Sequence, residues 1–168
     1  MKCRALVFFA LAAFARSNAQ TTTQDISPAS RHEAIKAEAN SAYARQMEST
    51  GKLCQAEAAR GQQPYNICIG QADEAADRDL AVFYNNLQML CHDPNQLAAL
   101  QESEKSWRTY SQSAMKATHA AWPQGTGAPG FAGEVYLSLV RDHMRELHEI
   151  YALDITQSLT SQLGLTPK

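Results

Sequence analysis

Residues 72–90 restrict the fold most, because their apolar side chains recur at steps of four or three. The series is Ala72, Ala76, Leu80, Phe83, Leu87 and Leu90. This spacing predicts an α-helix with one face buried against other elements. Asn66 is a candidate N-cap. Negative charge in the first half would suit the positive end of the helix dipole, and four acids lie there: Asp73, Glu74, Asp77 and Asp79.

A second helix follows after a very short break. His92-Asp93-Pro94 ends the first helix, and Asp93 before Pro94 is a start signal for the next, which we expect from Pro94 to about Ala121. Its inner side would carry Leu97, Leu100, Trp107, Tyr110 and Ala114. The short connection predicts a central antiparallel hairpin.

Two further helices complete the predicted bundle. Residues 30–60 are rich in helix formers, with Gly51 as a candidate interruption and apolar positions at Ile35, Ala39, Ala42, Tyr43 and Met47. A final helix is expected from about Glu134 into the 150s, with an apolar set of Val135, Leu139, Met144 or Leu147, and Ile150 or Tyr151. No strand-like alternation occurs. We predict an all-α fold, a small bundle of about four helices forming a single domain over residues 30–165.

The start of the chain has the features of an export signal. Lys2 and Arg4 precede an apolar run from Ala5 to Ala15, and Ser17-Asn18-Ala19 offers small residues for cleavage. The run is too short to span a membrane. We therefore predict a signal peptide over residues 1–19, a flexible lead-in over 20–29, and a secreted or periplasmic protein without an integral membrane segment.

The charge of the exported chain favours some partners over others. Of the 15 basic residues, three lie in the leader, so the remaining 149 residues would carry 12 basic against 17 acidic residues. A net charge near −5 favours a cationic protein partner over nucleic acid or anionic membranes.

Three cysteines remain after the leader, an odd number for an oxidising compartment: Cys54, Cys68 and Cys91. Sequence alone does not fix their pairing. We favour Cys54 with Cys68, because they enclose a short segment with a break at Gly61-Gln62-Gln63-Pro64. Cys91 would then be a buried free thiol. A metal site is the alternative, but no histidine lies at ligand spacing from these cysteines.

The sequence offers little to suggest an enzyme or a cofactor. No nucleophile elbow, zinc-protease motif, phosphate loop or dinucleotide fingerprint occurs. His143 and His148 are five residues apart, which does not suit a metal pair on one helix face. With Glu146 and Glu149 they are expected to form a solvated charged face.

Several motifs in order resemble one known family. Cys54 and Cys68 are followed by Asp77, Leu80, Tyr84 and Leu87, then by Leu100, Glu104, Trp107 and Tyr110, a glycine-bearing loop and Tyr136. This arrangement, from Leu53 to Tyr151, is similar to the LprI-type lysozyme inhibitors. The resemblance implies an exported, disulfide-bonded helical domain of bacteria. One member of this family is known to inhibit lysozyme.

The chain departs from the family pattern at one pair of positions and at two single residues. The family's second cysteine pair is absent from the corresponding regions, Ser111–Met115 and Leu137–Leu139. Ser111 stands where an arginine is usual, and Glu104 where a glutamine is usual. The motif residues are interpreted as packing positions, with Asp77 and the Tyr84 hydroxyl hydrogen-bonded inside the hairpin.

These observations support two functional hypotheses. In the first, the protein inhibits a cationic lysozyme-type enzyme by filling its cleft and offering hydrogen-bond donors to its two carboxylates. The inserted segment would be the loop from Gln124 to Phe131, within the glycine-rich stretch between Trp122 and Gly133. Its contact residues would be Gln124, Gly125, Thr126, Gly127 and Phe131. In the second, the protein is an immunity or accessory protein that neutralises a dedicated toxin. A structural role in the cell envelope is the remaining alternative.

Overall fold

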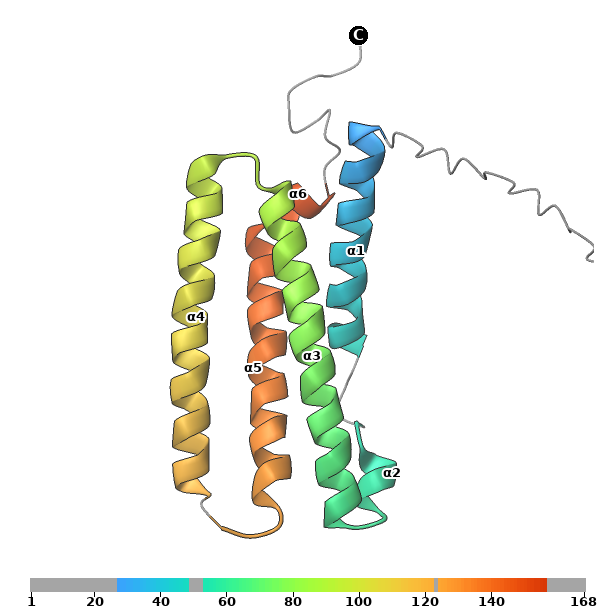
Figure 1. The fold of residues 1–168 in the computed structure, drawn as a ribbon, viewed down its shortest axis with the longest axis vertical. Helices are drawn as coiled ribbons and strands as arrows, with labels where there is room; N and C mark the ends of the chain where they lie inside the picture. Colours follow the sequence, from blue (N-terminus) through green and yellow to red (C-terminus); the bar gives the residue numbers. More distant parts are fainter. Residues whose placement is uncertain (1–26, 49–52, 123, 157–168) are drawn as a thin grey trace, which may run out of the picture.

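The computed structural model describes residues 27–48, 53–122 and 124–156, and helix accounts for 88% of these residues (Figure 1). The helices are α1 Pro28–Glu48, α2 Gln55–Ala58, α3 Gln62–Leu90, α4 Pro94–Ala121, α5 Ala128–Ile150 and α6 Ala152–Thr156. No strand occurs in the described ranges, so the all-α prediction is confirmed. None of the described helices is long and apolar enough to cross a membrane. The predicted signal peptide lies outside the described residues.

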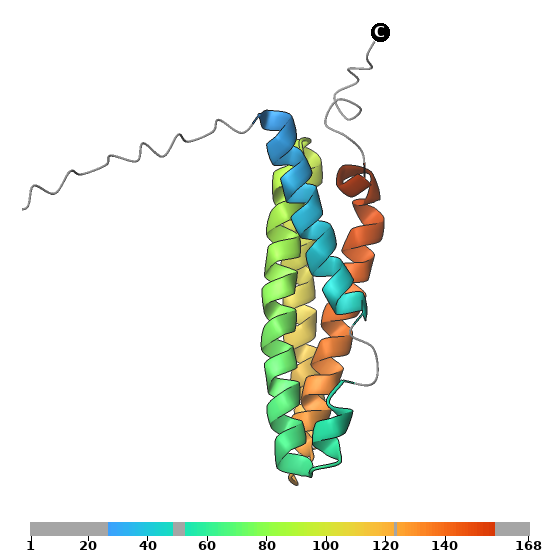
Figure 2. The same cartoon turned by 90° about the vertical axis from the view of Figure 1, so that its right-hand side faces the viewer.

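The long helices alternate in direction. α3 and α4 are antiparallel, as predicted, and α5 returns alongside them (Figure 1). The closest neighbours of α3 are α1 and α5, whereas α4 packs mainly on α5. Figure 2 shows α1 crossing the α3 and α5 pair on the side away from α4. The pair α3 and α5 therefore forms the centre of the bundle, flanked by α1 and α4.

Helix α3 has the predicted buried face but begins earlier than expected. Leu80, Phe83 and Leu87 are fully or almost fully buried. The helix starts at Gln62 after Gly61, whose φ of 122° suits glycine. Pro64 lies in the first turn, where the missing backbone N–H is tolerated. Asn66 is therefore inside the helix, and its prediction as N-cap was wrong.

The earlier start of α3 also removes the helix-dipole explanation for its acids. Dipole effects are confined to the first and last turns, and Asp73 lies well beyond them. Asp79 instead accepts hydrogen bonds from Arg45 and Gln46 of α1 at 2.5–2.9 Å. Glu74 lies 3.9 Å from Arg78. Asp79 and Glu74 therefore form separate contacts with different partners.

Helix α1 is shorter than the helix predicted over residues 30–60. It begins at Pro28, so the last two residues of the predicted lead-in are helical. Ala39 and Ala42 are fully buried, and Tyr43 and Met47 pack against the core. The predicted apolar stripe is therefore confirmed at these four positions, whereas Ile35 is not part of the core cluster. Gly51 lies outside the described residues.

The start of α4 follows the prediction, but one of its core assignments does not. Asp93 caps the helix by accepting a hydrogen bond from the Asn95 backbone N–H at 2.8 Å. Leu100 is fully buried. Tyr110, however, is 60% exposed, so its assignment to the inner side was wrong. The buried residues of α4 are Leu100, Glu104 and Ser111, and Tyr110 does not share their face.

Helix α5 begins at Ala128, six residues before the predicted start. Pro129 fits the first turn, and Gly130, one of the glycines that suggested a loop, lies in the helix and close to α3. A Cβ atom on Gly130 would lie 2.6 Å from the Tyr65 ring, so only glycine fits this contact. The predicted apolar set was only partly right: Met144, Leu147 and Tyr151 are buried, whereas Val135 and Leu139 are only half-buried. The buried apolar positions are Ala132, Leu137, Val140, Met144 and Leu147.

The cysteines are arranged as predicted. Cys54 and Cys68 form a disulfide that joins the start of α2 to α3, with Cα atoms 5.8 Å apart. Cys91 is a free, buried cysteine at the end of α3. The disulfide therefore fixes the lower end of the bundle, below the point where α1 ends (Figure 1).

Candidate functional site

The α4–α5 loop lies at one end of the bundle, and three of its predicted contact residues are exposed (Figure 1). Gln124, Gly125 and Thr126 point to solvent, whereas Gly127 is half-buried. The φ of Gly125 is 107°, a conformation that favours glycine. Residues 124–127 are non-helical and α5 begins at Ala128, so the loop ends earlier than predicted. Phe131 lies on the first turn of α5.

Helix α3 holds this loop in place. The Asn66 side-chain amide donates a hydrogen bond to the Thr126 carbonyl at 2.7 Å. The Tyr65 hydroxyl donates to Glu134 of α5. Burial, and then this hydrogen bond, raises the pKa of Tyr65 to about 12, so the phenol keeps its proton at neutral pH. The loop is therefore attached to α3 by one polar contact, and a second joins α3 to the start of α5 beside it.

Two aromatic rings flank the loop on its outer side. Trp122 at the end of α4 and Phe131 on α5 have ring centroids 4.8 Å apart. Their exposed fractions are 52% and 37%. Sequence reasoning selected Phe131 but used Trp122 only as a boundary. Together with Gln124, Gly125 and Thr126, they form what we call the loop surface.

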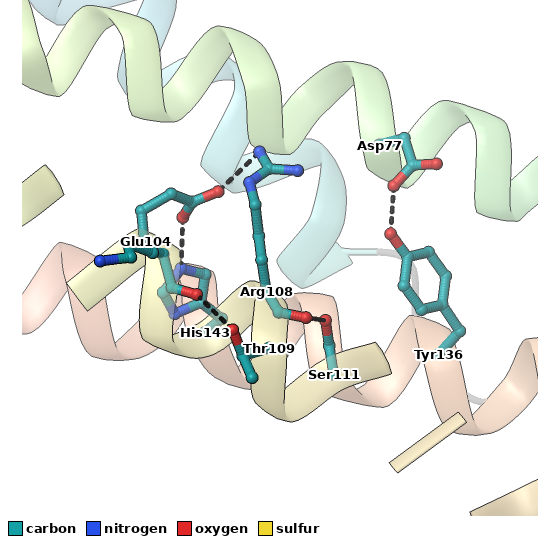
Figure 3. A network of polar contacts seen from close by, with 8 residues as sticks. Asp77, Glu104, Arg108, Thr109, Ser111, Tyr136 and His143 are labelled. Atoms are coloured by element: carbon teal, nitrogen blue, oxygen red, sulfur yellow. Dashed lines mark hydrogen bonds and ion pairs between the residues drawn. The ribbon is translucent and has the colours of Figure 1, made fainter. Parts of the chain in front are cut away.

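The motif residues of α3 and α4 have different roles. Leu80, Leu87 and Leu100 are buried in the core. Asp77 is exposed and accepts a hydrogen bond from Tyr136 of α5. The prediction that Asp77 is hydrogen-bonded inside the hairpin was therefore wrong. The contact joins α3 to α5 instead of lying within the α3–α4 hairpin (Figure 3).

A buried polar cluster joins α4 to α5. Glu104 accepts a hydrogen bond from His143 Nε2 at 2.8 Å and forms an ion pair with Arg108 at 2.7 Å (Figure 3). The Trp107 ring stacks on His143 with centroids 4.3 Å apart. Glu104 and His143 are only 4% and 3% exposed, so these two side chains hold the helices together and are themselves closed to solutes.

The prediction of a solvated histidine face was wrong. His143 is buried in this cluster, and His148 is half-buried, with its ring stacked on Tyr43 of α1 at 4.0 Å. The sequence nevertheless contained a pattern that predicts burial of His143. Val140, His143 and Leu147 follow each other at steps of three and four, which places the histidine on the buried face.

The family comparison agrees with the motif order. The family model described as lysozyme inhibitor LprI matches residues 54–147, which is more than half of the chain. The chain belongs to the LprI lysozyme inhibitor family. The matched segment begins at the first cysteine of the disulfide and includes the loop surface and the buried polar cluster. Searches of curated proteins and of solved structures gave no match.

Membership of the LprI family implies a protein partner, since the family is named for inhibition of lysozyme. LprI is an inhibitor family and not an enzyme family. The membership also agrees with the helical fold and with the disulfide between Cys54 and Cys68.

The described residues of this LprI chain contain one cluster with the elements of a metal site. Cys54, Glu57 and Cys68 have candidate ligand atoms within 4.8 Å of one another. Both sulfur atoms are, however, joined in the disulfide. Because zinc and related ions need free thiolates, only the Glu57 carboxylate remains as an ordinary ligand.

Proposed function

We propose that this LprI-family protein inhibits a lysozyme-type enzyme by placing the loop surface in the cleft of the enzyme. The exposed pair of Trp122 and Phe131 beside a narrow, glycine-bearing loop is the observation that carries the proposal. Large aromatic side chains are frequent energetic centres of protein interfaces. A narrow loop beside them has the shape that a cleft requires.

The chemistry of the loop suits a cleft that contains two carboxylates. Gln124 and Thr126 are exposed and provide side-chain donors, and Gly125 allows close approach to its backbone. The hydrogen bond from Asn66 to the loop limits the conformational entropy lost on binding. Donors held in this way would satisfy carboxylates that lose water on complex formation.

The charge of the chain and its predicted export both support the proposal. Without residues 1–19 the chain would have a net charge near −5, which favours association with a cationic enzyme. A secreted or periplasmic location, reached by cleavage of the leader, would bring the two proteins together. The inhibitor would act by occlusion and would catalyse no reaction.

The experiment measures inhibition of purified lysozyme on a cell-wall suspension. The double variant Trp122→Ser, Phe131→Ser should raise the inhibition constant by about 30-fold or more, because two aromatic contacts are lost. The matched control is Ile150→Ser, Leu153→Ser, which removes two exposed apolar side chains at the opposite end of the bundle. Circular dichroism verifies that both variants fold.

Two results would contradict the assignment of the loop surface. One is equal inhibition by the loop variant and the control variant. The other is unchanged inhibition after Gln124–Thr126 is replaced by Ser-Gly-Ser, a change that keeps the start of α5. If the intact protein does not bind lysozyme but binds one secreted toxin with nanomolar affinity, the immunity-protein hypothesis would replace the hypothesis of lysozyme inhibition.

A further inference from the structure

A groove lies between the second half of α4 and α5, separate from the loop surface. It has a volume of about 350 Å³. The lining residues are Trp107, Arg108, Ser111, Gln112, Met115, Lys116, His119 and Tyr136. This volume is at the lower end of the range of roughly 300–1,000 Å³ that is usual for small-molecule sites. We call it the α4–α5 groove.

The groove follows from the loose packing of α4. None of the residues from Gln112 to Ala121 is buried, although they form the last turns of a long helix. Met115 and Tyr136 are half-buried, so apolar surface remains accessible between the two helices. The groove is therefore concave and partly apolar.

The floor of the groove is held in place before any ligand binds. Trp107 is stacked on His143, which is bonded to Glu104. The Tyr136 hydroxyl is bonded to Asp77. Burial, and then this bond, raises the pKa of Tyr136, so its phenol is neutral and does not repel an anion at neutral pH. Fixed walls reduce the entropy lost on binding.

The charge of α4 is opposite to that of the protein as a whole. Residues 105–121 contain two lysines, one arginine and one histidine, and no acid. Among the residues that line the groove, Arg108, Lys116 and His119 are basic, and none is a carboxylate. Lys116 has no ion-pair partner in the described part of the chain. Arg108 bonds Glu104, but its side chain is 58% exposed.

We propose that the α4–α5 groove binds a small amphipathic carboxylate, with the apolar body between Trp107, Met115 and Tyr136 and the carboxylate at Lys116 and Arg108. The basic rim complements an anion and would repel a cationic enzyme. The small concave volume suits one molecule and not a flat membrane surface. This site is therefore distinct from the loop surface and takes a ligand of the opposite charge.

The binding experiment uses octanoate as the probe and the Trp122→Phe protein with its disulfide intact. This variant leaves Trp107 as the sole tryptophan, so its fluorescence reports on the groove. We expect a saturable change with octanoate, and affinity lower by about tenfold or more for octanol and for octylammonium. Equal affinity for all three probes would show that charge is not recognised and would overturn the proposal.

A pair of charge reversals on one helix tests the position of the ligand. Lys116→Glu should weaken octanoate binding by about tenfold, whereas Lys105→Glu should change it less than about twofold. Lys105 is on the same helix but outside the groove, and it lies 3.4 Å from Glu102. Met115→Ser should also weaken binding, because it removes part of the apolar wall.

Two outcomes would reject the site. Equal effects of Lys116→Glu and Lys105→Glu would indicate general attraction to a basic helix. Binding to phosphatidylglycerol vesicles without any saturable octanoate response would indicate a lipid surface as the source of the anion, and not a small carboxylate.

Discussion

Asp73 lies at the contact between α3 and α5 and provides the sharpest test of the packing. Its Oδ1 atom is buried and has no hydrogen-bond partner within the described residues. Gly133 of α5 lies opposite, where a Cβ atom would be 2.8 Å from Asp73 Oδ2. Burial, and then the charge of Asp77, raises the pKa of Asp73 from 3.8 to about 6. The folded protein therefore binds this proton more tightly than the unfolded chain.

The sign and size of the effect on stability follow from this shift. A carboxyl with a raised pKa in the folded state imposes no penalty below the unfolded pKa of 3.8. The penalty grows as the pH rises toward about 6 and is complete above it. A shift of about two pKa units corresponds to about 3 kcal/mol. Since Asp73 is only partly buried, we expect an effect of about 1–2 kcal/mol after solvent screening.

The assay is urea unfolding of Asp73→Asn at pH about 7.5 and about 4. At the higher pH the variant should be more stable than the parent by about 1–2 kcal/mol, because the buried charge is gone. At the lower pH the difference should be close to zero, since the parent carboxyl is largely protonated. Glu74→Gln is the control, because it removes a charge from an exposed neighbour and should change stability by less than about 0.5 kcal/mol.

Two results would refute this reasoning about Asp73. A gain of equal size at both pH values would show that charge is not the cause. Destabilisation at the higher pH would show that the Asp73 carboxylate receives a hydrogen bond or ion pair important for folding.

Three further predictions concern stability, each measured by urea unfolding. Gly133→Ala should lower the free energy of unfolding by about 1–3 kcal/mol because its Cβ would overlap α3, whereas Gly70→Ala should raise it by about 0.5–1 kcal/mol because the added Cβ meets open space. Equal effects of the two substitutions would contradict the close contact between α5 and α3. Glu104→Ala should cost about 3 kcal/mol because its buried histidine and its arginine lose their acceptor; a loss below 1 kcal/mol would argue against the cluster. Replacing Cys54 and Cys68 by alanine should cost about 3 kcal/mol, and a reductant should then have no further effect.

The features that sequence predicts correctly depend on local spacing. The buried face of α3 repeats at steps of three and four over many turns, so its core residues Leu80 and Leu87 are unambiguous. Asp93 and Pro94 form a start signal that requires no knowledge of the rest of the protein. The disulfide was predicted because an intervening helix break brings its two cysteines together.

The features that sequence misses depend on which helices are neighbours. In α5, residues 135–151 allow more than one apolar stripe, and the stripe that includes His143 becomes evident only when α4 supplies Glu104 and Trp107. The assignment of Tyr110 to the inner side of α4 was wrong for a related reason. Its spacing from Trp107 permits an inner position, but α4 contacts α5 along a narrower line than the prediction assumed.

Two glycines in the first turns of α5 show how such an error changes a functional hypothesis. Gly130 was part of the evidence for a long loop, yet Gly130 and Gly133 each allow a close contact between α5 and α3. The loop consequently ends at Gly127, and Phe131 lies on α5, which is packed against α3. A ring on a packed helix loses less entropy on binding than one on a long loop. The shorter loop therefore strengthens the case for insertion at this end of the bundle, because Phe131 is held on α5 and the loop is bonded to Asn66 of α3.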